Sequence, residues 1–290
     1  KLFKINLELT MAKELIFIDW DDTLVNRENA EDFESVIDEN NTIYQMSPMF
    51  IGAVEALKQL QEKYHVVIVS SRGDLNRIRQ LQLQSYDLES SIMPLDSFTF
   101  EDNDNRLLFT RYGETNFPDK ASFILYIQKM SGNKIKVFID DDHTEIEAAQ
   151  SKGIPTIHAT HNKYLQNTEQ FFSGLIHQVD NMELSHIFNK VAAEIRNNSR
   201  SISWGRQIAG FFSVHLPIAQ SLENLASKLQ RKSANEVSEE FDRYLKKIAY
   251  DPNKKGDIAV SLTKAKTAID KHISAPIEIK EGQLFLNRMG

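Results

Sequence analysis

Four short apolar runs, separated by helix-length segments, dominate the first half of the chain. They cover residues 14–19, 66–70, 135–140 and 154–158, and they are rich in Ile, Val and Phe. Strand-like runs that alternate with helices are typical of a parallel sheet covered by helices. We therefore expect an α/β fold with a Rossmann-like parallel sheet in this half of the chain.

Three helices are expected between these runs. Ser47 is a suitable N-cap and Pro48 a suitable first helical residue, and apolar residues recur at helical spacing from there to position 64. The segment 120–130 predicts a second helix that ends at Gly132. A third helix is expected over 145–151, with Gly153 at its C-terminal end.

After about residue 180 the strand pattern stops and helical periodicity continues to about residue 270. Apolar residues then recur every three or four positions, at Leu184, Ile187, Val191, Ile195, Leu222, Leu225, Leu229, Val237, Phe241, Leu245, Ile248, Leu262, Ala265 and Ile269. A chain of 290 residues commonly forms two domains. We predict an α/β domain over 11–165, leaving the residues before Met11 aside, and an all-α domain over 175–290.

Composition narrows the function classes. The chain has no cysteine, which excludes disulfides, thiolate catalysis and cysteine-ligated zinc. Its longest apolar run, 208–219, is too short to span a bilayer, so we expect a soluble protein. Residues 1–180 have a net charge of −12 and residues 181–290 a net charge of +5. An acidic half suits a cation site and a basic half suits anionic partners, although ordinary surface variation gives the same difference.

Polar residues of a specific kind follow three of the four predicted strands. Ligands of open α/β sheets bind beyond the carboxyl ends of the strands, so these residues are candidates for one site. They are Asp19, Asp21, Asp22 and Thr23 after the first strand, Ser70 and Arg72 after the second, and Asp140, Asp141, Asp142 and Glu145 at and after the third. Lys120 begins the helix before that third strand.

Carboxylates that converge at one sheet edge repel one another unless a hard cation binds them. Ligation by oxygen alone, without Cys or a His pair, indicates Mg²⁺. Phosphate is the expected partner of such a cation. Lys120 and a serine hydroxyl would bind phosphoryl oxygens, and a carboxylate beside the metal could attack phosphorus.

The motif DWDDTL (19–24), the strand that ends in Ser70, Lys120 and the motif DDxxxE (140–145) together resemble the four motifs of the haloacid dehalogenase superfamily, in order and spacing. This resemblance covers residues 14 to about 160. It implies that Asp19 is the nucleophile, that Asp21 is the general acid and base, and that Ser70 and Lys120 bind the phosphoryl group. Mg²⁺ would be held by Asp19, the backbone carbonyl of Asp21 and Asp141.

The same resemblance gives Asp140 or Glu145 the role of orienting metal-bound waters, and Thr23 that of fixing the turn. Ser71 is an alternative to Ser70, and another lysine is an alternative to Lys120. Members of the superfamily without the second aspartate are typically not phosphatases, so Asp21 favours phosphoryl chemistry over dehalogenation.

In proteins of this superfamily, the segments inserted after the first motif and between the second and third motifs form the cap that limits the size of the substrate. The first, about 25–45, and the second, about 74–119, are both short, so we expect a small or absent cap and an open cleft. An open cleft suits a phosphorylated protein, with phosphotyrosine favoured. The alternatives are a phosphatase for a metabolite, nucleotide or nucleic-acid end, and a non-enzymatic scaffold that binds lipid or protein.

The helical half contains aromatic residues close to basic ones. They are Trp204, Ile208, Phe211, Phe212 and His215 near Arg200 and Arg206, followed by Lys264, Lys266, Lys271 and His272. This combination suits an anionic membrane surface, although a domain core with a solvated face gives the same pattern. The layout resembles bacterial effector phosphatases with a helical phosphoinositide-binding module. That resemblance implies a cytoplasmic protein, or one secreted into a host cell and associated with membranes there. Without a continuous Lys/Arg stripe, nucleic-acid binding is not expected.

Overall fold

The computed structural model describes residues 14–27, 33–93, 107–160, 168–203, 212–229, 231–248, 250–251 and 257–274. The chain divides into two compact units, residues 1–179 and 180–290. Within the described residues, no helix is both long and apolar enough to cross a membrane.

The first unit contains a six-stranded parallel sheet in the order β5-β6-β4-β1-β7-β8. Its strands are β1 (Leu15–Ile18), β4 (His65–Ile68), β5 (Ser90–Ile92), β6 (Leu107–Phe109), β7 (Ile135–Asp140) and β8 (Thr156–His158). After β1 the chain adds strands on one side, and it then crosses back to place β7 on the other side of β1. The order of strands therefore reverses at β1, where open α/β sheets bind their ligands.

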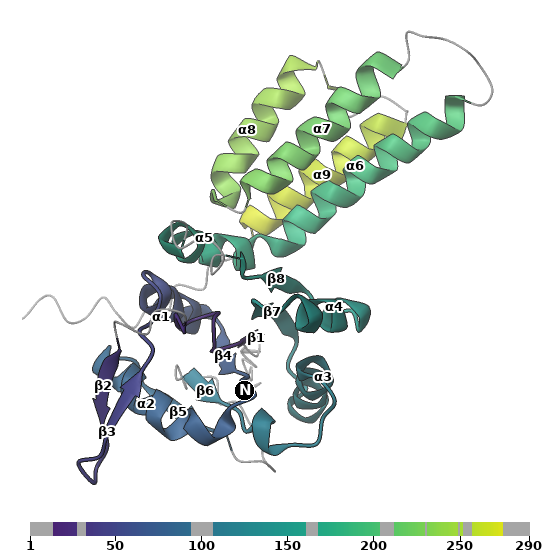
Figure 1. Ribbon diagram of the computed structural model, residues 1–290. Helices are drawn as coiled ribbons and strands as arrows, with labels where there is room; N and C mark the ends of the chain where they lie inside the picture. Colours follow the sequence, from purple (N-terminus) through teal and green to yellow (C-terminus); the bar gives the residue numbers. More distant parts are fainter. Residues whose placement is uncertain are drawn as a thin grey trace, which may run out of the picture. The chain divides into compact units, whose positions relative to one another are not determined.

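Helices lie on both faces of this sheet, with α1 and α2 on one side and α3 and α4 on the other (Figure 1). Their bounds are α1 (Ala53–Lys63), α2 (Asn76–Ser85), α3 (Lys120–Ser131), α4 (His143–Ser151) and α5 (Thr168–Asp180). Short 3₁₀ turns cover Gly73–Leu75 and Tyr112–Glu114. The predicted α/β fold with a parallel sheet is thus confirmed.

The four residues of β1 are fully buried because helices cover both faces of the strand. Leu15 and Phe17 pack toward α3, where Phe123, Ile124 and Ile127 belong to the same apolar cluster. Alternate residues of a strand point to opposite faces. An apolar run without polar alternation is what a strand buried on both sides requires.

The predicted start of the first helix is wrong. Helix α1 begins at Ala53, after Gly52 with φ +87°, and not at Ser47. The residues before Gly52 are paired with the segment after β1, because Asn26 donates its N–H to the carbonyl of Pro48 at 3.0 Å and Phe50 donates to Leu24 at 2.9 Å. These bonds hold the chain extended where the local pattern predicted a helical turn.

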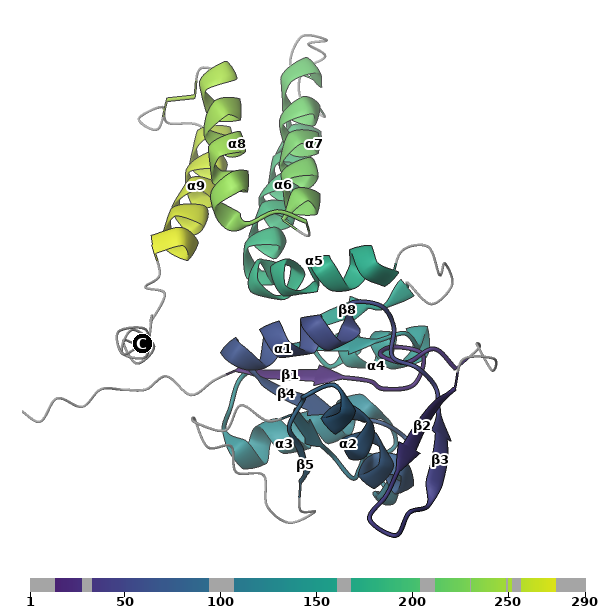
Figure 2. The same ribbon diagram turned by 90° about the vertical axis from the view of Figure 1, so that its left-hand side faces the viewer.

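The first insertion forms a β-hairpin, β2 (Glu34–Ile37) and β3 (Ile43–Met46), which pair antiparallel. Figure 2 shows this hairpin beyond the carboxyl end of β1. The second insertion contains α2, β5 and β6, and both strands join the main sheet. The strand-like run expected near Phe98 lies outside the described residues. Within the described residues, the hairpin is therefore the part of the two insertions that lies outside the main sheet and its covering helices.

The second unit consists of helices that share one core. They are α6 (Met182–Ser203), α7 (Phe212–Lys228), α8 (Ala234–Lys247) and α9 (Asp257–Ser274). Most of the apolar positions with helical spacing are buried in that core, and Ile187 and Ile248 are partly buried against it. Helix α8 begins with a capping box, in which Ser233 and Glu236 bond each other's backbone N–H groups.

Candidate functional site

Asp19 lies directly after β1, at the carboxyl edge of the sheet. Its backbone N–H donates to Ile139 on the neighbouring strand β7 at 2.9 Å, which fixes the position of the residue. Its side chain is buried. Lys120 donates from Nζ to Oδ1 of Asp19 at 2.8 Å and to Oδ2 of Asp140 at 2.8 Å. A single buried ammonium group thus joins two strand ends.

The structure brings three of the predicted carboxylates together. Asp19, Asp140 and Asp141 each offer an oxygen atom within 4.8 Å of the others. Asp140 is the last residue of β7, and Asp141 follows it. Oxygen donors alone suit a hard cation such as Mg²⁺. Lys120 bonds two of these three carboxylates, and a divalent cation would offset the negative charge that remains among them.

The electrostatics of the cluster reflect this excess. Burial raises the pKa of Asp19 from 3.8 to about 7, and Lys120 opposes the rise. Burial also raises the pKa values of Asp140 and Asp141. Burial alone would lower the pKa of Lys120, but the carboxylates of Asp19 and Asp140 outweigh it and raise that pKa. The lysine therefore stays charged, and burial makes the ionised carboxylates costly without a cation.

Thr23 fixes the loop that carries Asp141. Its hydroxyl donates to Oδ1 of Asp141 at 3.0 Å and accepts from the backbone N–H of the same residue at 3.0 Å. Thr23 is fully buried. The segment after β1 is in this way attached to the segment after β7.

Asp21 lies beside Ser70 and a residue that the sequence did not single out, Arg79. Ser70 donates from Oγ to Oδ2 of Asp21 at 3.2 Å, and Nη2 of Arg79 donates to the same oxygen at 2.8 Å. Nη1 of Arg79 donates to the carbonyl of Arg72 at 3.1 Å. Arg79 is 1% exposed, although arginine is rarely buried to this degree. A single arginine within a predicted helix gives no local signal of such a contact.

Glu145 and Asp142 have backbone partners. Glu145 accepts from the N–H of Lys120 at 3.2 Å, so it contacts the start of α3. Asp142 caps α4 by accepting from Thr144 at 2.8 Å. The carbonyl of Asp141 lies 2.9 Å from Nε2 of His158. These contacts hold the acidic loop in place around Asp140 and Asp141.

The loop after β4, which contains Ser70 and Arg72, packs tightly against the 3₁₀ turn at Gly113. A Cβ atom placed on Gly113 would lie 2.2 Å from the carbonyl oxygen of Ser71 and 2.9 Å from the backbone nitrogen of Gly73. Only glycine fits at this close approach. Arg72 donates its backbone N–H to Oγ of Ser70 at 3.2 Å, which orients that hydroxyl.

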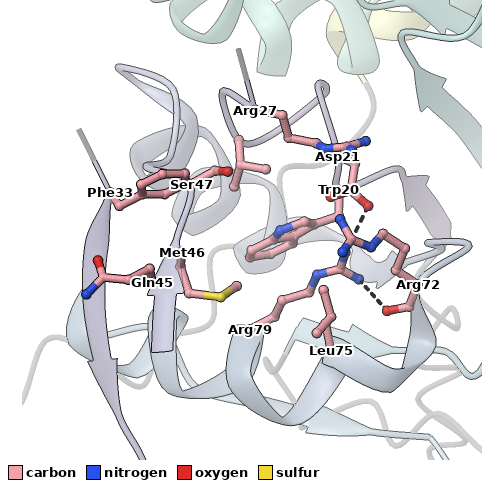
Figure 3. Close-up of a pocket in the computed structure, with 11 residues that line it drawn as sticks. Trp20, Asp21, Arg27, Phe33, Gln45, Met46, Ser47, Arg72, Leu75 and Arg79 are labelled. Carbon is pink, nitrogen blue, oxygen red and sulfur yellow. Dashed lines mark hydrogen bonds and ion pairs between the residues drawn. The ribbon is translucent and has the colours of Figure 1, made fainter. Parts of the chain in front are cut away.

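A pocket of about 190 Å³ adjoins Asp21 (Figure 3). Its lining residues come from the segment after β1, the hairpin, the loop after β4 and helix α2. They are Trp20, Asp21, Val25, Arg27, Phe33, Gln45, Met46, Ser47, Arg72, Leu75 and Arg79. Figure 3 shows Phe33, Gln45 and Met46 on one side and Trp20, Arg72 and Arg79 on the other.

The aromatic and basic segment predicted in the helical half cannot be placed. Residues 204–211 lie outside the described residues, as do the side chains of Arg200, Phe212 and His215. On α9, Lys264 lies 3.4 Å from Glu194, and Lys266 lies 2.7 Å from Asp242. Part of the predicted basic cluster is therefore paired with carboxylates.

Neither a protein-family model nor a curated protein matches this chain.

Proposed function

We propose that this chain is a Mg²⁺-dependent phosphatase that hydrolyses phosphate monoesters through an aspartyl-phosphate on Asp19. One observation supports the proposal most strongly. Asp19 lies at the switch point of the sheet, belongs to an acidic triad with Asp140 and Asp141, and accepts from the ammonium group of Lys120 at 2.8 Å. A carboxylate nucleophile needs both a cation and a phosphoryl-binding group nearby.

In the first step, a carboxylate oxygen of Asp19 attacks phosphorus and the bond to the leaving-group oxygen breaks. Asp21 gives a proton to that oxygen, so the product leaves as a neutral alcohol or phenol. Lys120 and Ser70 bind phosphoryl oxygens. Asp19, Asp141 and the carbonyl of Asp21 would hold Mg²⁺, whose charge would offset that of the phosphoryl group.

In the second step, water attacks the aspartyl-phosphate. Asp21, now ionised, accepts a proton from the water as the new bond to phosphorus forms, and the bond between phosphorus and Asp19 breaks. Inorganic phosphate is released and both aspartates return to their first state. Arg79 keeps Asp21 in place during both proton transfers, since its Nη2 bonds Oδ2 of Asp21. The single hydroxyl hydrogen of Ser70 points to the same oxygen in this structure, and it turns to a phosphoryl oxygen when the substrate binds.

The proposed substrate is a phosphorylated protein, with phosphotyrosine favoured. The described part of the first insertion is a two-stranded hairpin, which leaves room for a phosphate presented by a large molecule.

The test is phosphate release by the full chain, with and without Mg²⁺, from phosphotyrosine and phosphoserine peptides and from small phosphorylated metabolites. Asp19→Asn is expected to abolish release, because an amide does not attack phosphorus. Asp270→Asn, the same substitution on α9 of the other unit, is the matched control and is expected to leave turnover unchanged. Turnover without Mg²⁺, or turnover retained by Asp19→Asn, would contradict the proposal.

A further inference from the structure

We infer that the pocket beside Asp21 binds the leaving group of the substrate, and that this group is a single aromatic ring, the phenol of a phosphotyrosine side chain. The inference rests on the proposed function. It goes further by assigning the pocket, the hairpin and Arg79 to recognition of the ring.

The position of the pocket decides which part of the substrate it holds. Asp21 is among the lining residues, whereas Asp19, Lys120 and Asp140 are not. Asp21 is the group that protonates the leaving-group oxygen, so whatever is bonded to that oxygen lies on the side of Asp21. The phosphoryl group itself lies against Asp19 and Lys120.

The size and lining of the pocket select the chemical class. About 190 Å³ is less than the roughly 300–1,000 Å³ of pockets for drug-sized ligands, and it is enough to hold one ring. Apolar side chains line about half of it, namely Trp20, Val25, Phe33, Met46 and Leu75, and they offer a surface for the faces of a ring. A serine or threonine side chain buries much less apolar surface against these residues than a phenol ring does.

Arg79 supplies an independent observation. Its guanidinium group lies 5.4 Å from the centre of the Trp20 ring, and the side chain is 1% exposed. Nη1 and Nη2 have acceptors, but within the described residues the buried Nε has none. A buried donor without an acceptor is costly. That Nε has almost no accessible surface, so it does not bond a group in the pocket, but the guanidinium cation beside Trp20 favours an aromatic guest.

The experiment compares two peptides of one sequence that differ only in carrying phosphotyrosine or phosphoserine. Wild-type chain with Mg²⁺ is expected to prefer phosphotyrosine by at least about tenfold in kcat/KM, since a ring buries far more apolar surface than a serine methylene. Free phosphotyrosine is expected to be hydrolysed as well, because the pocket recognises the ring.

Two substitutions of pocket-lining residues at the hairpin test whether these side chains bind the aromatic ring. Phe33→Ala and Met46→Ala are each expected to lower kcat/KM for the phosphotyrosine peptide about 5- to 20-fold, and to change the phosphoserine value less than about twofold. Phe33 is 46% exposed, so its truncation should not disturb the fold. Ile37→Ala is the matched control, because Ile37 lies on the same hairpin, is 58% exposed and does not line the pocket.

Three results would overturn the inference while leaving the phosphatase intact. They are equal rates on both peptides, equal losses on both peptides in Phe33→Ala and Met46→Ala, and a loss in Ile37→Ala as large as theirs. If no peptide or metabolite releases phosphate, the proposed function fails and this inference fails with it. Binding provides a second readout: the Asp19→Asn variant with Mg²⁺ should bind the phosphotyrosine peptide more tightly than its phosphoserine counterpart in calorimetry.

Discussion

Lys120 contacts Asp19 and Asp140 at the same time, at 2.8 Å each, and all three side chains are buried. Buried ion pairs are expensive to disrupt from one side, because the remaining charges lose their partner without gaining water. The lysine therefore has a structural role besides its proposed contact with phosphate. Both roles can be measured on one variant.

Lys120→Met is expected to lower the free energy of unfolding by about 3–5 kcal/mol at neutral pH, since it leaves two buried carboxylates without a cation. Phosphate release should fall at least about a hundredfold. Chemical denaturation checks the first value, and added Mg²⁺ should restore part of the loss. Lys152→Met is the control, because its ion pair with Asp119 is partly exposed and worth about 0–1 kcal/mol. Equal stability of the two variants would contradict the expectation.

Gly113→Ala is expected to displace the loop that holds Ser70, because the added Cβ would meet the Ser71 carbonyl at 2.2 Å. Phosphate release should fall together with stability. Gly132→Ala is the comparison, since Gly132 has φ +74° with open space around it. That variant should lose about 1 kcal/mol of stability through backbone strain and keep its activity. Full activity in Gly113→Ala would show that the loop adjusts without moving Ser70.

Among the elements, the buried strands were the easiest to predict. A strand covered on both faces is mostly apolar, and β1 (LIFI), β4 (HVVI) and β7 (IKVFID) carry that local signal. The roles of β5 and β6 and the true start of α1 were missed. Each depends on pairing with a distant segment, as when Phe50 bonds Leu24, and no local pattern encodes such a partner.

The residues of the candidate site also fall into those that the sequence predicted and those that it did not. Asp19, Asp140 and Asp141 were predicted because they follow strands, and parallel strands bring their carboxyl ends to one edge. Arg79 was not predicted, because its contact with Asp21 follows from how α2 packs on the sheet. The pocket likewise depends on the hairpin, whose placement the sequence does not specify.

Ser233→Ala tests whether the helical elements are independent of the catalytic ones. Loss of the Ser233 side chain should lower the stability of the helical unit by about 1 kcal/mol, since the backbone N–H of Glu236 loses its partner. Phosphate release should not change, because Ser233 belongs to the other compact unit. A parallel loss of activity would show that the two units are coupled.

At the scale of the whole molecule, the net charge of +5 on residues 181–290 is the basis for expecting an anionic partner. We propose that the helical unit binds membranes that contain phosphoinositides. Arg200→Glu combined with Arg206→Glu should weaken cosedimentation of the full chain with such liposomes, since each basic residue near an anionic surface contributes about 1 kcal/mol. Asp19→Asn should bind as wild type does. Binding that is independent of phosphoinositide content would refute the proposal.

The residues that contact each other around Asp19 are far apart in the chain: Asp19 and Lys120 are separated by 101 positions in the sequence. Contacts of such long range form late, after the entropy cost of closing the loops has been met. A cation held there would stabilise the finished fold more than the transition state for folding. Mg²⁺ should therefore slow unfolding while leaving the refolding rate nearly unchanged, which stopped-flow fluorescence can measure. Mg²⁺ bound beside Asp19 would in this way also stabilise the contacts that form last in folding.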